Sequence, residues 1–442
     1  MLHRGRPVAS ATVLSHPEQL ARLTEACPEA APTAVLAGDP CFDRMLAALP
    51  DRDRFRRALG VGPDQRLILV NSTWGPRSLL GDGAADPLPA LLPRLAAELP
   101  LDEYRMAAVL HPNIWYGHGP GQVRGWLDRA RRGGLTLVPP LAGWRQALIA
   151  ADCVIGDHGS VTFYAAALGA PVLLGAFPED DLDPDSPVAA LGRAAPRLDP
   201  HRGLRRQLDR VMDGHDPRRY AAVTAATSSD PGRSAALLRR LCYRLIGIPE
   251  PAGRPALLDR LPLPEFEPAR PSAPIRVLTR LIGSDRGEPP GIAVTRYADA
   301  DQDPEPEQDM DAAHTVVPED TRDPGRLSLA DVIVRHGAAD DPRLGPPGVW
   351  AAEVLDRHPH CALAAYATGP DSCTVRTRAG VTVRLTAAPG TDGRPALCDP
   401  AAYASACYAW LSQGKEPTEL TATGMTVHIG RAQYRVAVEP AE

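Results

Sequence analysis

The sequence predicts an α/β protein: a doubly wound, mostly parallel sheet followed by a small C-terminal α+β domain. Two observations predict the sheet. From residue 66 onward, short apolar runs alternate with longer amphipathic runs, and the strand-like run comes first in each unit. The length of 442 residues agrees, because it suffices for two or three domains that each bury a core.

The predicted strands of this sheet are short and almost entirely apolar. They are RLILVNS (66–72), YRMAAVLH (104–111), LTLVPP (135–140), DCVIGD (152–157) and PVLLGAF (171–177). Amphipathic runs predict helices at 87–98, 121–132, 143–151, 161–168, 202–213 and 232–246. Together they form one doubly wound domain, which we assign to residues 59–248.

The flanking segments differ in composition. Residues 1–58 carry one strand-like run, one helical run and a turn, which is too little for a second complete sheet. Residues 249–325 are rich in proline and then acidic (ADADQDPEPEQDMDA), which is typical of a linker. Residues 326–442 predict the small α+β domain, from strands at DVIVRHG, CTVRTRAGVTVRLTA and MTVHIGRAQYRVAVE and helices at GVWAAEVLDRH and PAAYASACYAWLSQG. This domain shows no catalytic constellation, and our hypothesis for it is a protein partner.

Charge and cysteine content exclude several functions. The 48 Lys+Arg and 54 Asp+Glu give a net charge of -6, and no domain has the concentrated basic charge that nucleic-acid binding needs. Lys415 is the only lysine, and the bias toward Arg, Ala, Pro and Gly indicates a GC-rich coding sequence of the actinobacterial type. The eight cysteines contain no C-x-x-C pair, so the pattern predicts buried, reduced thiols rather than a zinc site or a disulfide framework.

The sequence predicts a cytoplasmic protein with at most peripheral membrane association. The N-terminal MLHRGRPVAS lacks an apolar signal core, and the longest uncharged apolar stretch, residues 165–177, is too short to span a bilayer. The helix at 232–248 has an apolar stripe beside Arg239, Arg240 and Arg244. This pattern fits either an interfacial helix or a packed helix with solvated arginines, and we favour the packed helix.

Four polar or small residues, Asp157, His158, Gly159 and Ser160, separate an apolar strand from an apolar helix. In a doubly wound sheet, ligands bind beyond the carboxyl ends of the strands, and this segment lies at such an end. The free N–H groups and positive dipole of the helix N-terminus favour an anion there, and the Ser160 hydroxyl either caps the helix or binds a phosphate oxygen. The alternative is that Asp157 and Ser160 only cap the helix and His158 is a surface residue. Four such residues in a row favour a binding loop.

Two other predicted strands end in polar residues. NSTWG (71–75) closes the first strand and HPNIWYGHGPGQ (111–122) follows the second. Ser72, Thr73 and His111 can all donate hydrogen bonds to a phosphate. We therefore predict that they join residues 157–160 in one site, with His111 as the candidate catalytic residue and with no metal or separate cofactor.

The segment ADCVIGDHGSVTFYAAALGAPVLL (151–174) resembles the phosphate-binding segment of GT-B glycosyltransferase-like enzymes. It is similar to the CDP-glycerol glycerophosphotransferases, which have Asp-Tyr-Ser-Ser at the tetrad, and to the UDP-N-acetylglucosamine 2-epimerases, which have Asp-Ser-Gly-Gly. LHPN (110–113) is similar to the His-Pro of the glycerophosphotransferases, whose histidine contacts the donor pyrophosphate. The resemblance covers roughly residues 35–245 and implies pyrophosphate contacts for His111, Gly159 and Ser160, with Asp157 shaping the loop.

The chain also departs from these families. The epimerases follow the tetrad with paired glutamates, where this chain has Phe163 and Tyr164, and the glycerophosphotransferases have an acid at the position of Tyr164. The sequence therefore does not identify the nucleobase of the donor. The resemblance implies that residues 1–58 are the tail of a first GT-B domain and the crossing into the second. Most of the first domain, which supplies the acceptor pocket and the general base in this superfamily, is then expected to be missing.

The resemblance implies a GT-B-like transferase that uses a nucleotide-diphosphate donor, either a nucleotide sugar or a CDP-polyol, in a reaction related to cell-wall polymers. Catalysis would come from electrostatic stabilisation of the leaving pyrophosphate by the helix N-terminus, Ser160 and His111. The alternative is a non-catalytic nucleotide-binding or scaffold protein that retains the phosphate loop, because one fold carries many functions.

Overall fold

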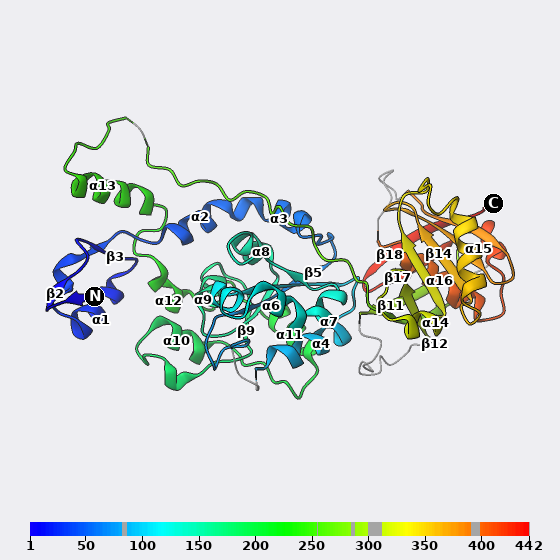
Figure 1. The fold of residues 1–442 in the computed structure, drawn as a ribbon, viewed down its shortest axis with the longest axis horizontal. Helices are drawn as coiled ribbons and strands as arrows, with labels where there is room; N and C mark the ends of the chain where they lie inside the picture. Colours follow the sequence, from blue (N-terminus) through cyan, green and yellow to red (C-terminus); the bar gives the residue numbers. More distant parts are fainter. Residues whose placement is uncertain (82–85, 254, 284–287, 299–311, 390–397, 442) are drawn as a thin grey trace.

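The computed structural model describes residues 1–441 except 82–85, 254, 284–287, 299–311 and 390–397. Figure 1 shows an elongated molecule with a parallel-sheet domain in the middle. A barrel that contains the C-terminus lies at one end, and the N-terminal segment and helix α13 lie at the other end.

The central domain is built on a parallel sheet in the order β7-β6-β5-β8-β9. The strands are β5 (Arg66–Ser72), β6 (Tyr104–Leu110), β7 (Thr136–Leu137), β8 (Cys153–Gly156) and β9 (Val172–Leu174). The first strand of this sheet is the central strand β5. Strands β6 and β7 extend the sheet to one edge, and strands β8 and β9 then form its other side, next to β5. Val70 consequently lies opposite both Ala108 and Ile155. The direction of winding reverses between β5 and β8, which makes this the position where doubly wound sheets bind ligands.

The sheet is covered on both faces, which explains why its strands are almost entirely apolar. Ile68 and Val70 of β5 pack into one core, and Leu67 and Leu69 pack into the other, as the alternation of a strand requires. The helices of the first core are α4 (Leu88–Glu98), α6 (Pro120–Trp126), α7 (Asp128–Arg132) and α11 (Leu204–Asp213). Those of the second are α2 (Pro40–Ala48), α3 (Arg52–Ala58), α8 (Trp144–Ala150) and α9 (Ser160–Ala167).

The predicted elements of this domain are present, with differences at some bounds. The predicted helix at 121–132 is two helices, α6 and α7, and strand β7 is shorter than the predicted 135–140. Pro139 and Pro140 explain the shorter strand, because proline has no N–H to donate to a ladder. Helices α5 (Pro112–His118), α10 (Pro187–Ala194) and α12 (Ala221–Thr224) are additional to the prediction.

The N-terminal segment contains one small βαβ unit. Strand β3 (Thr12–Leu14) pairs in parallel with β4 (Ala34–Leu36) across helix α1 (Pro17–Ala26), and β1 (Leu2–His3) pairs with β2 (Arg6–Pro7). Helix α13 (Ser234–Ile246) starts beside α2, because Asp43 accepts hydrogen bonds from the backbone N–H groups of Gly232 and Ser234. Leu241 of α13 is buried, whereas Leu245 and Ile246 in its last turn are exposed, so the helix packs only in part.

The C-terminal domain is a barrel that closes in the order β10-β11-β17-β18-β16-β15-β14-β13-β12. Its strands are β10 (Ile275–Ile282), β11 (Gly291–Tyr297), β12 (Ala312–Pro318), β13 (Val332–His336), β14 (Leu363–Ala367), β15 (Ser372–Thr377), β16 (Thr382–Ala387), β17 (Met425–Ile429) and β18 (Ala432–Pro440). Helix α16 (Ala401–Leu411) is buried on all sides and belongs to the same core as the inward side chains of the strands. The barrel domain also contains helices α14 (Pro324–Ser328) and α15 (Pro347–Arg357). Trp350 of α15 packs against Tyr366 of β14.

The structure corrects the predicted linker at 249–325, because β10, β11 and β12 lie within it and form part of the barrel. Proline-rich and acidic composition dominated the prediction there. Strand β11 pairs with β17, far away in the sequence, and such long-range pairing leaves no local signal. Most of the acidic stretch, residues 299–311, lies outside the described residues.

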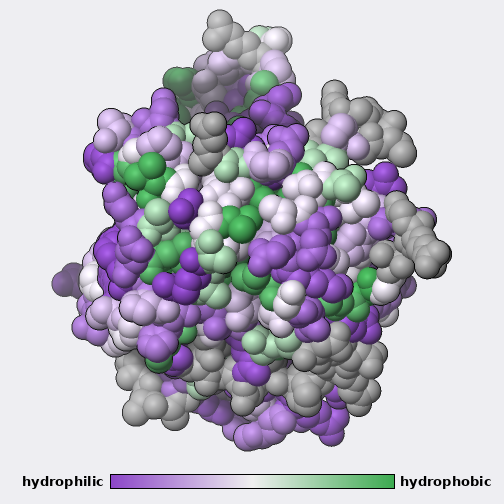
Figure 2. Space-filling view, turned by 90° about the vertical axis from the view of Figure 1, so that its right-hand side faces the viewer, coloured by the Kyte–Doolittle hydropathy of each residue, from purple (hydrophilic) through white to green (hydrophobic). Residues whose placement is uncertain are grey.

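The barrel contacts the amino end of the parallel sheet. The Arg296 guanidinium of β11 is almost fully buried and forms a bidentate ion pair with Asp102, just before β6, and a second ion pair with Asp399 at 3.0 Å. Leu101 N donates to Arg296 O at 2.8 Å. The barrel is therefore attached opposite to the carboxyl ends of the strands. Figure 2, which faces the barrel end, shows apolar residues in small separate groups among polar ones.

Candidate functional site

The carboxyl ends of β5, β6 and β8 meet at the point where the winding of the sheet reverses. Strand β5 ends at Ser72, and His111, directly after β6, donates its backbone N–H to Ser72 O at 3.0 Å. Strand β8 ends at Gly156 and is followed by Asp157. The three polar strand ends predicted from the sequence are thus neighbours in space.

Asp157 joins the loops after β5 and β8. Its carboxylate accepts hydrogen bonds from Thr73 N at 2.9 Å, Leu79 N at 3.2 Å and Gly159 N at 3.0 Å, and lies 3.2 Å from the Ser72 hydroxyl oxygen. Burial raises the pKa of Asp157, and the three backbone N–H groups act in the opposite direction. With its acceptor positions occupied from inside the protein, Asp157 positions the loop. This role agrees with the shaping role that the resemblance implies.

A second buried pair fixes the start of helix α9 against β5. The side chains of Asn71 and Thr162 hydrogen-bond each other at 3.1 Å, and both residues are buried. Gly156 lies directly beside this pair: an added Cβ would lie 2.2 Å from Thr162 Oγ1 and 2.4 Å from Asn71 Nδ2. The end of β8 therefore requires glycine for close approach.

Gly159 brings the loop after β8 against the loop after β5. A Cβ at Gly159 would lie 2.9 Å from Thr73 Cβ and 3.1 Å from Asp157 Oδ1. The closeness of Thr73 to the start of α9 places its hydroxyl and that of Ser160 on neighbouring loops. Ser160 is exposed and Thr73 is partly exposed.

The N-terminus of α9 is not capped by a side chain. The helix begins at Ser160 with Gly159 as its N-cap residue, and no side chain hydrogen-bonds to its first turn. Asp157 bonds Gly159 N rather than an N–H inside the helix. The first N–H groups of an α-helix have no intrahelical acceptor, so those of Ser160 and Val161 provide hydrogen-bond donors beside a positive dipole end. The capping interpretation of this segment is not realised in the structure.

His111 is held in one orientation. Its Nδ1 accepts a hydrogen bond from Asn113 N at 3.1 Å, which places the proton of the neutral ring on Nε2. Partial burial lowers the pKa of His111, and the nearby Asp157 charge opposes this shift. The ring lies beside the exposed Trp74, with the ring centroids 6.1 Å apart. At neutral pH the side chain is thus an Nε2–H donor next to an aromatic surface.

His158 lies on the other side of the loop. Its ring meets that of Phe177 edge-on, with centroids 6.5 Å apart. Its Nδ1 is buried and has no hydrogen-bond partner among the described residues. The structure therefore places His158 in the tetrad beside an aromatic neighbour, and its predicted contact with a donor phosphate stays a prediction.

The structure brings the predicted site residues together, but some of them are buried and others are exposed to solvent. Thr73 and Ser160 lie at the start of α9 and are at least partly exposed, and the partly exposed His111 follows the neighbouring strand β6. Ser72, Asp157 and Gly159 are buried. The Ser72 hydroxyl accepts a hydrogen bond from Leu80 N at 2.8 Å and lies beside Asp157. Its predicted contact with a donor phosphate stays a prediction.

Sequence reasoning missed the exposed Trp74 and the buried pair of Asn71 and Thr162. Trp74 follows directly after the polar strand end, and this was the one local signal available. Asn71 and Thr162 are far apart in the sequence, so their pairing leaves no local signal in it.

Within the residues that the structure describes, no group of three or more His, Cys, Asp or Glu side chains is arranged to hold a metal ion. In the same part of the chain, no helix has the length and apolar character needed to cross a membrane.

Comparisons with known proteins concern the fold. No family model and no curated protein matches the chain. Solved structures that match include the wall teichoic acid polymerase TagF, 16% identical with a TM-score of 0.37, with 54% of this chain and 56% of that chain covered. Another is the UDP-GlcNAc 2-epimerase from Neisseria meningitidis bound to UDP-GlcNAc, 13% identical with a TM-score of 0.34, covering 53% and 61%.

A third match is Anabaena Alr3699/HepE in complex with UDP and glucose, 14% identical with a TM-score of 0.30, covering 54% and 64%. This chain spans less than two thirds of each of these proteins. The strand order of the central domain is that of a doubly wound parallel sheet, as the sequence predicts.

Proposed function

We propose that the carboxyl end of the parallel sheet binds the diphosphate of a nucleotide donor, and that the chain transfers a sugar or polyol-phosphate group from it. One observation carries the proposal. The uncapped N-terminus of α9 lies where the winding of the sheet reverses, with Thr73 beside Gly159 and with His111 at the end of the neighbouring strand β6. The nearby carboxylate of Asp157 accepts its hydrogen bonds from within the protein and does not compete for these donors.

The donors around α9 suit a phosphate. The N–H groups of the first turn and the positive end of the helix dipole attract an anion, and the Ser160 hydroxyl and the Nε2–H of His111 add neutral donors. Trp74 adds an exposed aromatic surface beside His111, against which a ring of the donor can pack.

The same groups support the transfer step. When the bond to the transferred group breaks, negative charge develops on the leaving phosphate oxygen. Donors already oriented by the fold stabilise this charge without reorganising, and removal of one such donor typically lowers kcat by about 10²–10³-fold. His111 is the candidate catalytic residue, because its Nε2–H is oriented by the bond from Asn113 N to Nδ1.

A cytoplasmic location is part of this proposal. It is supported by the eight cysteines, which all lie in the described residues and are all free thiols. Binding of a protein partner by the barrel domain stays a prediction.

The test is thermal unfolding of the full chain with CMP, CDP, UMP, UDP, GDP and ADP. A ligand at about 100 times its Kd stabilises the folded state by about 2.7 kcal/mol, or roughly 2–4 °C for a domain of this size. We expect one diphosphate to give this shift. Ser160→Ala and His111→Ala should each weaken it by about 1.5 kcal/mol, because each removes a hydrogen bond to a charged group.

The control is His201→Ala, which changes an exposed histidine that does not lie at the site. A diphosphate shift that persists in both site variants would contradict the assignment of the loop. Product formation with the same donor classes then separates the two functions. Binding without turnover would support the non-catalytic alternative.

A further inference from the structure

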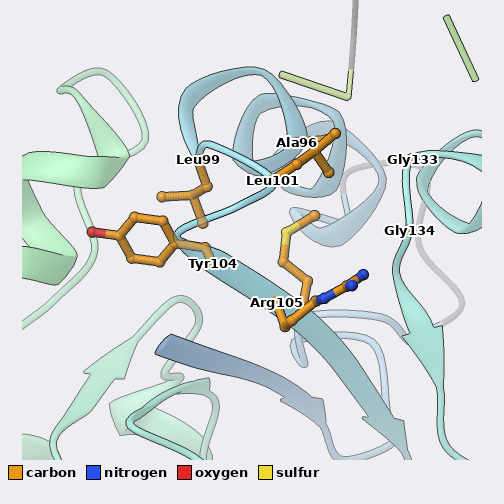
Figure 3. A pocket seen from close by; sticks show the side chains of 8 residues that line it. Ala96, Leu99, Leu101, Tyr104, Arg105, Gly133 and Gly134 are labelled. Carbon is orange, nitrogen blue, oxygen red and sulfur yellow. The ribbon is translucent and has the colours of Figure 1, made fainter. Parts of the chain in front are cut away.

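A cavity of about 420 Å³ lies along the outer edge of strand β7. Among the described strands β7 pairs only with β6, so its other edge is open. The volume is in the range of small-molecule sites. The cavity in Figure 3, between α4 and the amino end of β6, is only about 10 Å³ and has room for no more than a water molecule.

The outer wall of the β7 cavity is a segment of the connection between the two domains, which contributes Phe266, Glu267 and Ala269. This wall is fixed at several points. Ala269 N donates to the Thr136 hydroxyl at 3.1 Å, Ser272 N donates to Arg132 O at 2.8 Å, and Phe266 packs against the core beneath α8. The cavity therefore lies between two anchored walls and is open to solvent on one side.

The charged side chains of the lining favour an anion. Arg124 and Arg131 line the cavity, and neither forms an ion pair with a carboxylate in the described part of the chain. Glu267, on the outer wall, is the acid of the lining and is exposed. The planar guanidinium groups of two arginines suit a carboxylate or a phosphate, which accept paired hydrogen bonds.

The aromatic side chains favour a planar body for this anion. Trp115, Tyr116 and Phe266 line the cavity together with Pro139 and Pro140. Arg124 lies over the Trp115 ring, 5.8 Å from its centroid. The Trp115 indole N–H is buried and has no acceptor among the described residues, although a buried indole N–H usually has one. An acceptor on a bound ligand would satisfy it.

We propose that the β7 cavity is a second binding site, specific for an organic anion with a planar aromatic body. The cavity is distinct from the proposed donor site, because none of Thr73, His111, Gly159 and Ser160 lines it. The inference does not depend on the proposed function. The anion pairs with Arg131 and Arg124, and its ring packs between Trp115 and Phe266.

The test is isothermal titration calorimetry of the full chain with three probes: 2-naphthoate, neutral 2-naphthamide and the non-planar anion cyclohexanecarboxylate. We expect 2-naphthoate to bind once per chain and the other two to bind about tenfold more weakly, since each lacks one of the two recognised features. Arg131→Gln and Arg124→Gln should each weaken 2-naphthoate about tenfold. Arg57→Gln, which removes an equal charge from an exposed position on α3, is the matched control.

Three outcomes would overturn the proposal: no binding of 2-naphthoate at millimolar concentration, equal binding of the amide, or unchanged affinity in both arginine variants. Ser160→Ala separates the two sites. It should leave 2-naphthoate binding unchanged, and if it abolishes binding, the probe occupies the loops after the strands rather than the β7 cavity. Arg131→Gln should conversely retain any shift that a nucleoside diphosphate produces in thermal unfolding.

Discussion

Two buried regions, one in each domain, differ in how their polar groups are partnered. At the carboxyl end of the parallel sheet, Asp157 is saturated with hydrogen bonds and holds two loops together. Inside the barrel, His314 Nε2 and Ser405 Oγ are buried without partners in the described part of the chain. A satisfied buried group stabilises the shape of a site, whereas an unsatisfied one costs stability. Where the unsatisfied group titrates, as His314 does, the stability also depends on pH.

The largest expected effect comes from Asp157→Ala. The substitution leaves the N–H groups of Thr73, Leu79 and Gly159 without their acceptor in a buried environment, at about 1–3 kcal/mol each. We therefore expect a loss of about 3 kcal/mol or more in the free energy of unfolding of the sheet domain, measured by urea denaturation. Hydrogen exchange should show the loops at 72–80 and 157–160 opening first.

The matched control for this substitution is Asp180→Ala, because the Asp180 side chain is 91% exposed and forms only a long ion pair with Arg77. It should leave the unfolding transition where it is. If Asp157→Ala behaves like Asp180→Ala, the carboxylate does not hold the loops together, and the contrast between the two domains fails.

The next effect concerns His314 of the barrel. Burial lowers the pKa of His314 to about 3, and its ring packs on Tyr408, whose hydroxyl reaches Asp331 at 3.4 Å. In the unfolded chain the pKa is near 6.5, so between about pH 6.5 and 3 the unfolded state binds the additional proton. The barrel should therefore lose stability as pH falls, on the order of 2 kcal/mol between pH 7 and 5.

His314→Leu tests this dependence, since it removes the titrating group and keeps an apolar side chain. Hydrogen exchange of α16 at pH 7 and pH 5 measures the stability of the barrel interior separately from the sheet domain. The variant should lose less stability than the parent over this range. Equal losses in both chains would assign the acid sensitivity to other groups.

A smaller effect is expected from substituting two adjacent hydroxyl residues at the end of β5, Ser72 and Thr73, which should affect stability and binding differently. Ser72→Ala removes the acceptor of Leu80 N and should cost about 1–2 kcal/mol of stability. Thr73→Val removes a hydroxyl that has no hydrogen-bond partner among the described residues and lies beside the start of α9. It should therefore leave stability nearly unchanged and weaken donor binding. Chemical denaturation and ligand-induced thermal shifts, measured on both variants, give the two readouts. Equal behaviour of the two variants would contradict the division between a buried and an exposed hydroxyl.

The sequence predicted the elements of the sheet domain because each of its strands is a continuous apolar run. The position of the tetrad was also predictable, since Gly159 and Ser160 interrupt an apolar pattern where a strand gives way to a helix. What the pattern could not show is which polar side chains point inward. Ser72 and Thr73 are chemically similar neighbours, and only the partners of Ser72 in the loop at 79–80 distinguish them.

The barrel was harder to predict, because its strands are joined over long distances. Strand β10 pairs with β12 across the acidic stretch, and β11 pairs with β17 across most of the domain. Composition alone favoured a linker for 249–325. Helix α16 gives a usable signal, because except for Ser405 its sequence is apolar on every side, and a helix of this kind is buried in a core.

The smallest effect is expected at Asp341, a carboxylate that contrasts with Asp157 because it lies at the surface. Asp341, at the surface of the barrel domain, is bound by the Arg343 guanidinium at 2.7 and 2.9 Å, and this ion pair lowers the pKa of Asp341 to about 2. Arg343→Gln should raise this pKa toward its ordinary value, which an NMR titration of the Asp341 carboxyl would measure. The paired state is lost only as pH falls through about 2, so stability at pH 7 should not change measurably, because solvent screens a surface pair. A clear fall in the Tm of the barrel would show instead that a single surface ion pair stabilises this domain, and the distinction drawn from Asp157 between buried and surface carboxylates would not hold.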